Sequence, residues 1–207
     1  MKKRVDLLRG ENAIYPTEHS WTPSAKNLAD ASRHIDQALD TRSPLLGTPE
    51  ATKALFELIR AEAAAGHRKE AVKRGEALLD GQMKLDWKTK GNLAVCLGDT
   101  CYAMGEYKKA VKFYEQGLNG GDPGPKTIEM RIGKAARAGK DYFRAMQAYS
   151  DAIKYCDPVD GQAEIAHFTH LVSLMNKTVR KDTAALDTED IFSDDNDDIS
   201  GLTLDEE

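Results

Sequence analysis

One stretch of this chain is repeated 35 residues later, and that repeat limits the fold more than any other feature. LGDTCYAMGEYKKAVKFYEQGL (97–118) aligns without a gap with IGKAARAGKDYFRAMQAYSDAI (132–153). The same residue types recur in both copies at Gly98/Gly133, Tyr107/Tyr142, Ala110/Ala145 and Tyr114/Tyr149, and Gly117 is matched by Ala152. A fixed period of this length is typical of proteins built from stacked supersecondary units.

Each copy has the pattern of two helices. Apolar residues recur at three- and four-residue steps on both sides of a central break. Gly105-Glu106 breaks the first copy and Gly139-Lys140-Asp141 the second, and we expect glycine to provide the turn conformation in both. Each copy is therefore predicted to be an antiparallel helix hairpin. The alanines that we expect to be fully packed between the helices are Ala110 and Ala145.

The pattern resembles the tetratricopeptide repeat (TPR) family, whose signature spans 34 residues with a Trp, a Leu-Gly pair, a Tyr, A-x3-F and a late Pro. Residues 91–124 match at Leu97-Gly98, Gly105, Tyr107, Ala110, Tyr114, Gly117 and Pro123, and residues 126–159 match at Ile132-Gly133, Tyr142, Ala145, Tyr149, Ala152 and Pro158. The family Tyr falls on Cys101 in the first unit, where Tyr102 is one position late, and on Ala136 in the second. Ala94 and Glu129 stand where the family has Trp. The resemblance implies an all-α, right-handed solenoid of antiparallel helix hairpins.

Weaker copies and caps extend the predicted solenoid in both directions. Residues 50–85 are interpreted as a divergent repeat, with Glu62 in the place of a large apolar residue. An N-terminal half-repeat is expected from Thr22-Pro23, and an amphipathic capping helix over 161–180. We thus predict about three repeats in a helical domain over 23–180. It follows a loosely ordered arm (1–22) and precedes a disordered acidic tail (181–207).

The charge of the chain is concentrated at its C-terminal end. The net charge is −5, but residues 186–207 hold ten acidic residues and no Lys or Arg, so residues 1–185 carry +5. Apolar residues such as Phe192, Ile199 and Leu202 are interspersed among these acids. The tail is interpreted as a solvated end, as a short linear motif, or as a segment that competes for the protein's own groove.

The resemblance also implies a binding surface, because the first helices of TPR hairpins line a concave groove that takes extended peptides or partner helices. Matching positions give a predicted groove of Phe56, Arg60, Asn92, Val95, Asp99, Tyr102, Met130, Arg131, Lys134 and Arg137. Apolar and cationic side chains in this set suit a peptide with alternating apolar and acidic residues. An ordinary solvated helix face is the alternative. The carboxylate clamp of some family members is not expected, because only Arg131 matches its sites.

Catalysis, cofactors and nucleic-acid binding are not expected. The sequence has no GxxxxGK[ST], HExxH, GxSxG or GxGxxG motif. His167 and His170 lack further ligands for a metal, and Cys96 and Cys101 are interpreted as small buried hydrophobes. The weakly basic body and the acidic tail do not suit phosphate binding. Without a signal-type or membrane-spanning apolar stretch, we expect a cytoplasmic protein that does not insert into membranes.

We therefore predict a non-enzymatic scaffold or adaptor that binds a protein or peptide partner in the groove, with self-association into a homo-oligomer as a further expectation. One alternative is a chaperone for an export substrate of the bacterial type III secretion class. Another is an inhibitor or regulatory subunit whose acidic tail occupies a basic site.

Overall fold

The computed structural model describes residues 25–39, 43–45, 47–82 and 85–190, and these residues form eight α-helices and one short π-helical segment, with no strand among them. In chain order the elements are α2 (Ala25–Ala38), α3 (Pro49–Ala64), α4 (Arg68–Ala77), η1 (Leu78–Gln82), α5 (Trp87–Ala103), α6 (Tyr107–Gly117), α7 (Pro125–Ala138), α8 (Tyr142–Ile153) and α9 (Gln162–Asp190). The all-α prediction is confirmed for this part of the chain.

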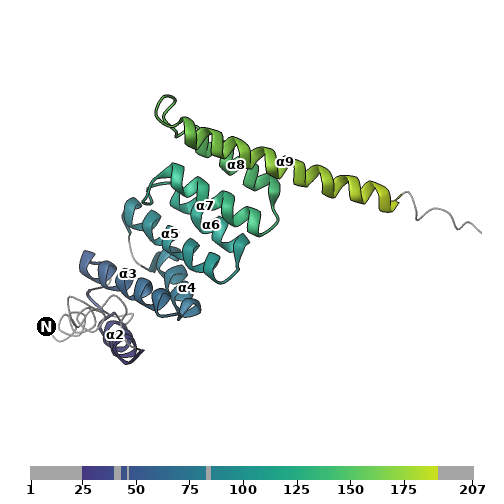
Figure 1. Ribbon diagram of the computed structural model, residues 1–207. Helices are drawn as coiled ribbons and strands as arrows, with labels where there is room; N and C mark the ends of the chain where they lie inside the picture. The colour runs from purple at the N-terminus through teal and green to yellow at the C-terminus, as the bar shows by residue number, and fades with distance from the viewer. Residues whose placement is uncertain (1–24, 40–42, 46, 83–84, 191–207) are drawn as a thin grey trace, which may run out of the picture.

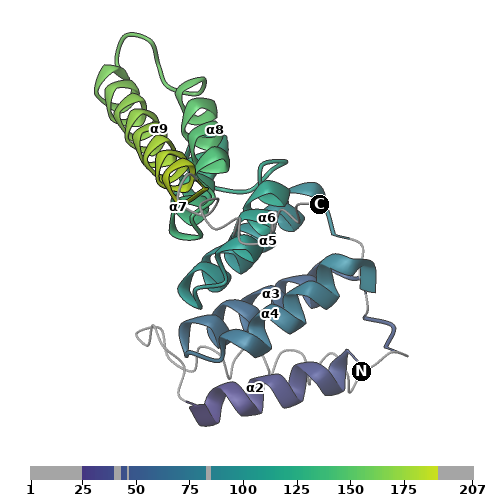
Figure 2. The same ribbon diagram turned by 90° about the vertical axis from the view of Figure 1, so that its right-hand side faces the viewer.

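Helices that are neighbours in the chain are also neighbours in space. Contacts join α2 to α3 and continue stepwise to α8 and α9 (Figures 1 and 2). Short connections make α3 and α4, α5 and α6, and α7 and α8 antiparallel pairs. The first helix of each pair is thus α3, α5 or α7, which are the helices that carry the predicted groove residues.

The turns within the helix pairs differ in which residue adopts the left-handed backbone conformation. Gly66 and Gly105 have φ of 91° and 78°, a conformation that glycine adopts without strain, and the expectation for Gly105 is confirmed. The expectation for Gly139 is wrong, because its φ is −81° and Lys140 takes the left-handed position with φ 62°. A Cβ on Gly139 would lie 3.2 Å from the Cβ of Tyr107. Gly139 therefore does not provide the turn conformation, and it lies in close contact with Tyr107.

A tyrosine ring packs directly on a helix glycine in both of the last two pairs. A Cβ on Gly98 would lie 2.5 Å from Cδ1 of Tyr114, and a Cβ on Gly133 would lie 2.5 Å from Cε1 of Tyr149. Ala110 and Ala145 have no exposed surface, which confirms that they pack fully between helices. Each pair thus closes around a small residue on one helix and an aromatic ring on the other.

A polar network attaches α2 to the first pair. Arg74 of α4 donates to Asp36 and Ser32 of α2 and to Glu62 of α3, with a distance of 2.6 Å between Nη1 of Arg74 and Oδ1 of Asp36. The side chain of Glu62 is only 6 % exposed. The large apolar residue that the repeat pattern leads one to expect at this position is thus replaced by a buried ion pair.

The last helix is longer than the sequence pattern predicts. Helix α9 has 29 residues and ends at Asp190, so the predicted helix end at residue 180 is wrong. Its first half packs on α8 through Phe168 and Met175, and its C-terminal part extends past the other helices (Figure 1). Lys, Ala and Leu after residue 180 favour helix even though the amphipathic period is lost. The arm at 1–22, the start at Thr22-Pro23 and residues 191–207 lie outside the described residues.

A carboxylate lies where the repeat family has its Trp. The side chain of Glu129 in α7 is 7 % exposed, and its Oε2 is 4.0 Å from Nη2 of Arg144 in α8. This oxygen and Nη1 of Arg144 are buried without a hydrogen-bond partner among the described residues. Burial raises the pKa of Glu129, and the charge of Arg144 opposes that rise. The ionised form of Glu129 therefore lowers the free energy of unfolding.

Replacing Ala110 or Ala145 by Leu should lower the free energy of unfolding by about 1–3 kcal/mol, because neither site has room for a larger side chain. Ala64 at the end of α3 is exposed and provides the control, since Ala64→Leu adds no buried volume. Urea denaturation measures all three variants. Equal stability of the Ala110 and Ala145 variants and the wild type would contradict the packing described.

Glu129→Gln should stabilise the protein at neutral pH by about 1 kcal/mol, since it removes a buried charge with an unpaired oxygen. A carboxyl group with a raised pKa binds its proton more tightly in the folded state. Its protonated form stabilises the fold below the unfolded pKa of about 4.3, and this contribution is lost as the pH rises through the folded-state pKa. Melting temperatures of the two proteins should therefore differ at pH 7 and converge toward pH 4. A difference independent of pH would contradict this explanation.

Candidate protein-binding surface

The predicted groove residues fall into three groups by exposure. Arg60, Asp99, Tyr102, Lys134 and Arg137 are exposed, whereas Phe56, Asn92, Met130 and Arg131 are half-buried and Val95 is buried. They come from α3, α5 and α7. Nine of the ten side chains therefore reach the surface of the first helices to some degree.

Val95 is not available to a partner, so its assignment as a groove contact is wrong. It is 5 % exposed, and Cβ atoms on Gly117 and Gly121 would lie 2.6 and 2.7 Å from its Cγ2. The end of α6 and the segment that follows it approach α5 closely because Gly117 and Gly121 have no side chain. Val95 fills the space that they leave, which makes it a core residue.

Two further residues of the predicted groove have local structural partners. Oδ1 of Asn92 accepts the backbone N–H of Asp122 at 2.6 Å and so holds the loop before α7. Arg60 lies 6.0 Å from the centroid of the Phe56 ring and pairs with Glu57 at 3.3 Å. The cation on α3 is therefore balanced within its own helix.

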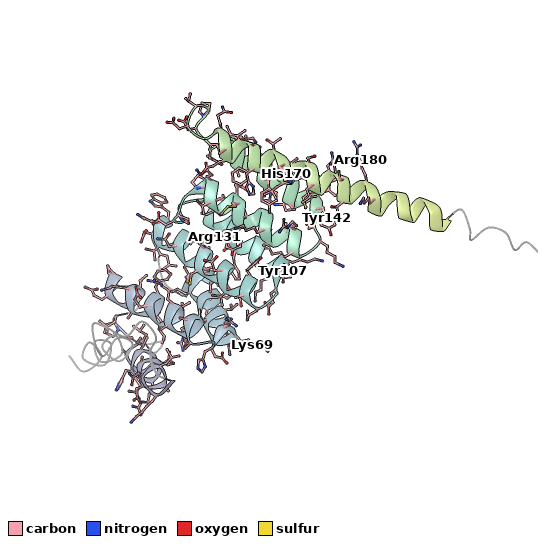
Figure 3. All side chains as sticks on the ribbon, in the orientation of Figure 1. Lys69, Tyr107, Arg131, Tyr142, His170 and Arg180 are labelled. Carbon is pink, nitrogen blue, oxygen red and sulfur yellow. The ribbon has the colours of Figure 1, made fainter. Side chains whose placement is uncertain are left out.

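Asp99 is the polar centre of the surface. It accepts the hydroxyl of Tyr114 at 2.8 Å and pairs with Nη1 of Arg131, so it joins α5 to α6 and α7. Burial, with the negative charge of Asp99, raises the pKa of Tyr114, which keeps its hydroxyl protonated and donating. Figure 3 shows Arg131 among the side chains of the central helices. The charge of Arg131 is thus directed at Asp99.

The remaining cations of the surface lie further along α7. Lys134 and Arg137 are exposed and form no ion pair or side-chain hydrogen bond with another described residue. Tyr102, at the end of α5, is 40 % exposed and meets the edge of Tyr107 with ring centroids 5.5 Å apart. A partly exposed aromatic ring and two unpaired cations are therefore present on neighbouring pairs of helices.

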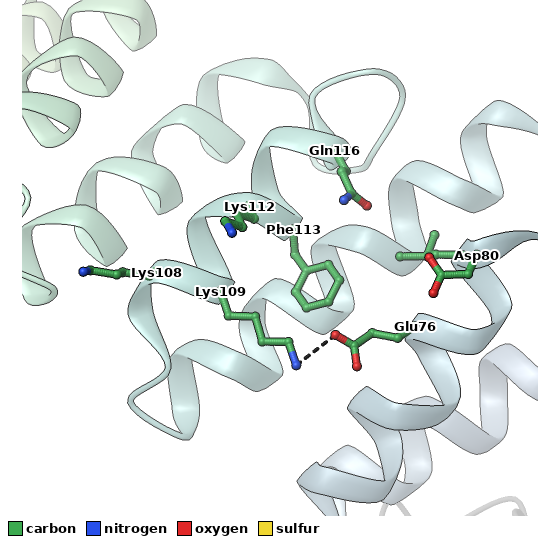
Figure 4. Close-up of a pocket in the computed structure, with 8 residues that line it drawn as sticks. Glu76, Asp80, Lys108, Lys109, Lys112, Phe113 and Gln116 are labelled. Carbon is green, nitrogen blue, oxygen red and sulfur yellow. Dashed lines mark ion pairs between the residues drawn. The ribbon is translucent and has the colours of Figure 1, made fainter.

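A cavity that the sequence analysis did not anticipate lies on the second helices. It has a volume of about 720 Å³ and is lined by Glu76, Leu79, Asp80, Lys108, Lys109, Lys112, Phe113 and Gln116 of α4, η1 and α6 (Figure 4). Lys109 pairs with Glu76 at 2.8 Å and lies 6.0 Å from the centroid of Phe113. The three lysines within YKKAVKF are the sequence feature that could have indicated this cavity. The resemblance to the repeat family instead predicts binding on the first helices.

The described residues contain no cluster of metal ligands, and burial keeps the Cys96 and Cys101 thiols protonated. No three His, Cys, Asp or Glu side chains among them are placed to hold a metal ion. Burial raises the pKa of the Cys96 and Cys101 thiols to about 11, so neither is a thiolate at neutral pH. None of the described helices combines the length and the apolar character that crossing a bilayer requires.

Comparison with known proteins does not assign this chain to a family. No protein-family profile matches the sequence, and no curated protein matches it either. The similarity to tetratricopeptide repeats therefore rests on the residues and contacts of this chain alone.

Tyr114→Phe should lower the free energy of unfolding by about 1 kcal/mol, because Asp99 loses a hydrogen bond that joins α5 to α6. The ring and its contact with Gly98 remain, so packing is unchanged. Chemical denaturation at pH 7 measures the effect. A variant as stable as the wild type would mean that this hydrogen bond does not contribute to folding.

Proposed function

We propose that this protein is a non-enzymatic adaptor that binds an extended segment of a partner protein on the surface of α3, α5 and α7. The proposal includes a solenoid of TPR-type hairpins, about three in number, with α2 and α9 as caps. The equivalent contacts of Gly98 with Tyr114 and of Gly133 with Tyr149 support this reading of the helix pairs. Two helix pairs with the same internal contact place their first helices on the same surface.

The observation that carries the proposal is the exposed and unpaired set of Tyr102, Lys134 and Arg137. Tyr and Arg are the residue types that contribute most at protein interfaces. Arg131 and Arg144 are paired with carboxylates of this chain, whereas Lys134 and Arg137 have no such partner among the described residues. Cations without a partner beside an exposed ring suit a ligand that brings its own acids and apolar side chains.

The proposal is tested by selecting binding peptides from a phage-displayed library of random dodecapeptides on the full-length protein. Affinities of selected peptides are then measured by fluorescence anisotropy. The double variant Tyr102→Ala, Arg137→Ala should bind at least about tenfold more weakly, since loss of an aromatic and an Arg contact typically removes more than 1 kcal/mol.

The matched control is Phe143→Ala, which removes an exposed aromatic ring from α8, a second helix. It should leave peptide affinity unchanged. Failure to select any peptide, or peptides that respond to Phe143→Ala and not to the double variant, would contradict the proposed surface.

A further inference from the structure

The cavity on the second helices has a cationic wall and an acidic wall. Lys108, Lys109 and Lys112 come from α6, whereas Glu76 and Asp80 come from α4 and η1 (Figure 4). Lys109 and Glu76 neutralise each other through their ion pair. Lys108 and Lys112 are exposed and form no ion pair or side-chain hydrogen bond with another described residue. The α6 wall therefore presents two unpaired cations.

Apolar surface lies between these two walls. Phe113 of α6 and Leu79 of η1 line the cavity, and Figure 4 shows the ring of Phe113 between the lysines and the acids. Phe113 is 6 % exposed, and Leu79 is half-buried. A cavity of about 720 Å³ has the size of pockets that hold a ligand. A ligand that fits it places apolar side chains between the walls and negative charges against α6.

The C-terminal segment of this same chain has that composition. Residues 191–207 contain seven acidic residues and no Lys or Arg. Five large apolar residues stand among these acids, namely Ile191, Phe192, Ile199, Leu202 and Leu204. The segment therefore complements both the unpaired cations of α6 and the apolar surface beside them.

The position of α9 indicates which copy of the protein this segment meets. Helix α9 packs against α8, whereas the cavity lies between α4 and α6, earlier in the row of helices (Figures 1 and 2). The C-terminal part of α9 extends past the other helices and ends at Asp190 (Figure 1). The segment therefore starts away from the cavity of its own copy and is presented to a second one.

We propose that residues 191–207 of one copy of this protein bind the cavity between α4 and α6 of a second copy. Exchange in both directions closes a symmetric dimer, as most homo-oligomers do. Acids of the segment pair with Lys108 and Lys112, and its apolar side chains contact Phe113 and Leu79. This site lies on the second helices, so it is separate from the surface of the proposed function, and neither proposal depends on the other.

The first test is the oligomeric state of the full-length protein, measured by sedimentation velocity over a range of concentrations. A dimer should form at low salt. Its dissociation constant should rise by about tenfold or more at about 1 M NaCl, where the Debye length is only about 3 Å. A monomer at every concentration would overturn the proposal, and so would a dimer that is insensitive to salt.

The second test reverses the unpaired cations. Lys108→Glu combined with Lys112→Glu should raise the dissociation constant of the dimer by about tenfold or more, because the acids of the segment then meet like charges. Both side chains are exposed, so the fold should be kept, which urea denaturation checks. Lys53→Glu combined with Lys90→Glu makes the same charge change at exposed positions of α3 and α5, and it should leave the dimer unchanged. No effect of the first double variant, or an equal effect of the second, would overturn the proposal.

The third test exchanges the charges between the segment and the cavity. Asp194→Lys combined with Asp195→Lys should weaken the dimer as the double variant of α6 does. Joining these two changes to Lys108→Glu and Lys112→Glu in one chain should restore the dimer, since opposite charges then face each other again. A fourfold variant that stays as weak as either double variant would overturn the pairing of the segment with α6.

Discussion

The approach of a tyrosine ring to a helix glycine is the contact on which the last two helix pairs depend. At Gly98 and at Gly133 a side chain of even one carbon would lie within 2.5 Å of the ring opposite. Because both rings are almost fully buried, the helices of each pair close to a distance that no larger residue permits. The position of each tyrosine hydroxyl follows from this packing, and in the first of these pairs it brings the hydroxyl of Tyr114 within hydrogen-bond distance of Asp99.

The contact between a glycine and a tyrosine ring occurs twice, and the polar residues beside it differ. Where Asp99 follows the glycine, the hydroxyl of Tyr114 and the guanidinium of Arg131 are satisfied internally, and three helices are joined. Where Lys134 follows it, the charge is reversed and Tyr149 keeps a hydroxyl without an acceptor among the described residues. The two helix pairs thus share one packing contact and differ in the charge of the residue that follows the glycine.

The sequence predicts the parts of this structure that depend on local pattern. The period and the small residues predict the pairs α5–α6 and α7–α8 and the burial of Ala110 and Ala145. It does not predict features set by contacts between distant segments. Val95 is buried against Gly117 and Gly121, Lys140 rather than Gly139 takes the left-handed turn position, and Arg131 is paired by Asp99 of another helix. The length of α9 was missed because helix propensity extends it beyond its amphipathic face.

The most direct test of the central contact is the free energy of unfolding of Gly98→Ala and Gly133→Ala. Helix propensity alone would make each variant about 1 kcal/mol more stable than the wild type. The close approach of Tyr114 and Tyr149 instead predicts that each is less stable, by about 1–3 kcal/mol. The sign of the change in the free energy of unfolding therefore distinguishes the two explanations, and an increase in stability at both sites would contradict the packing of the tyrosine rings on the glycines.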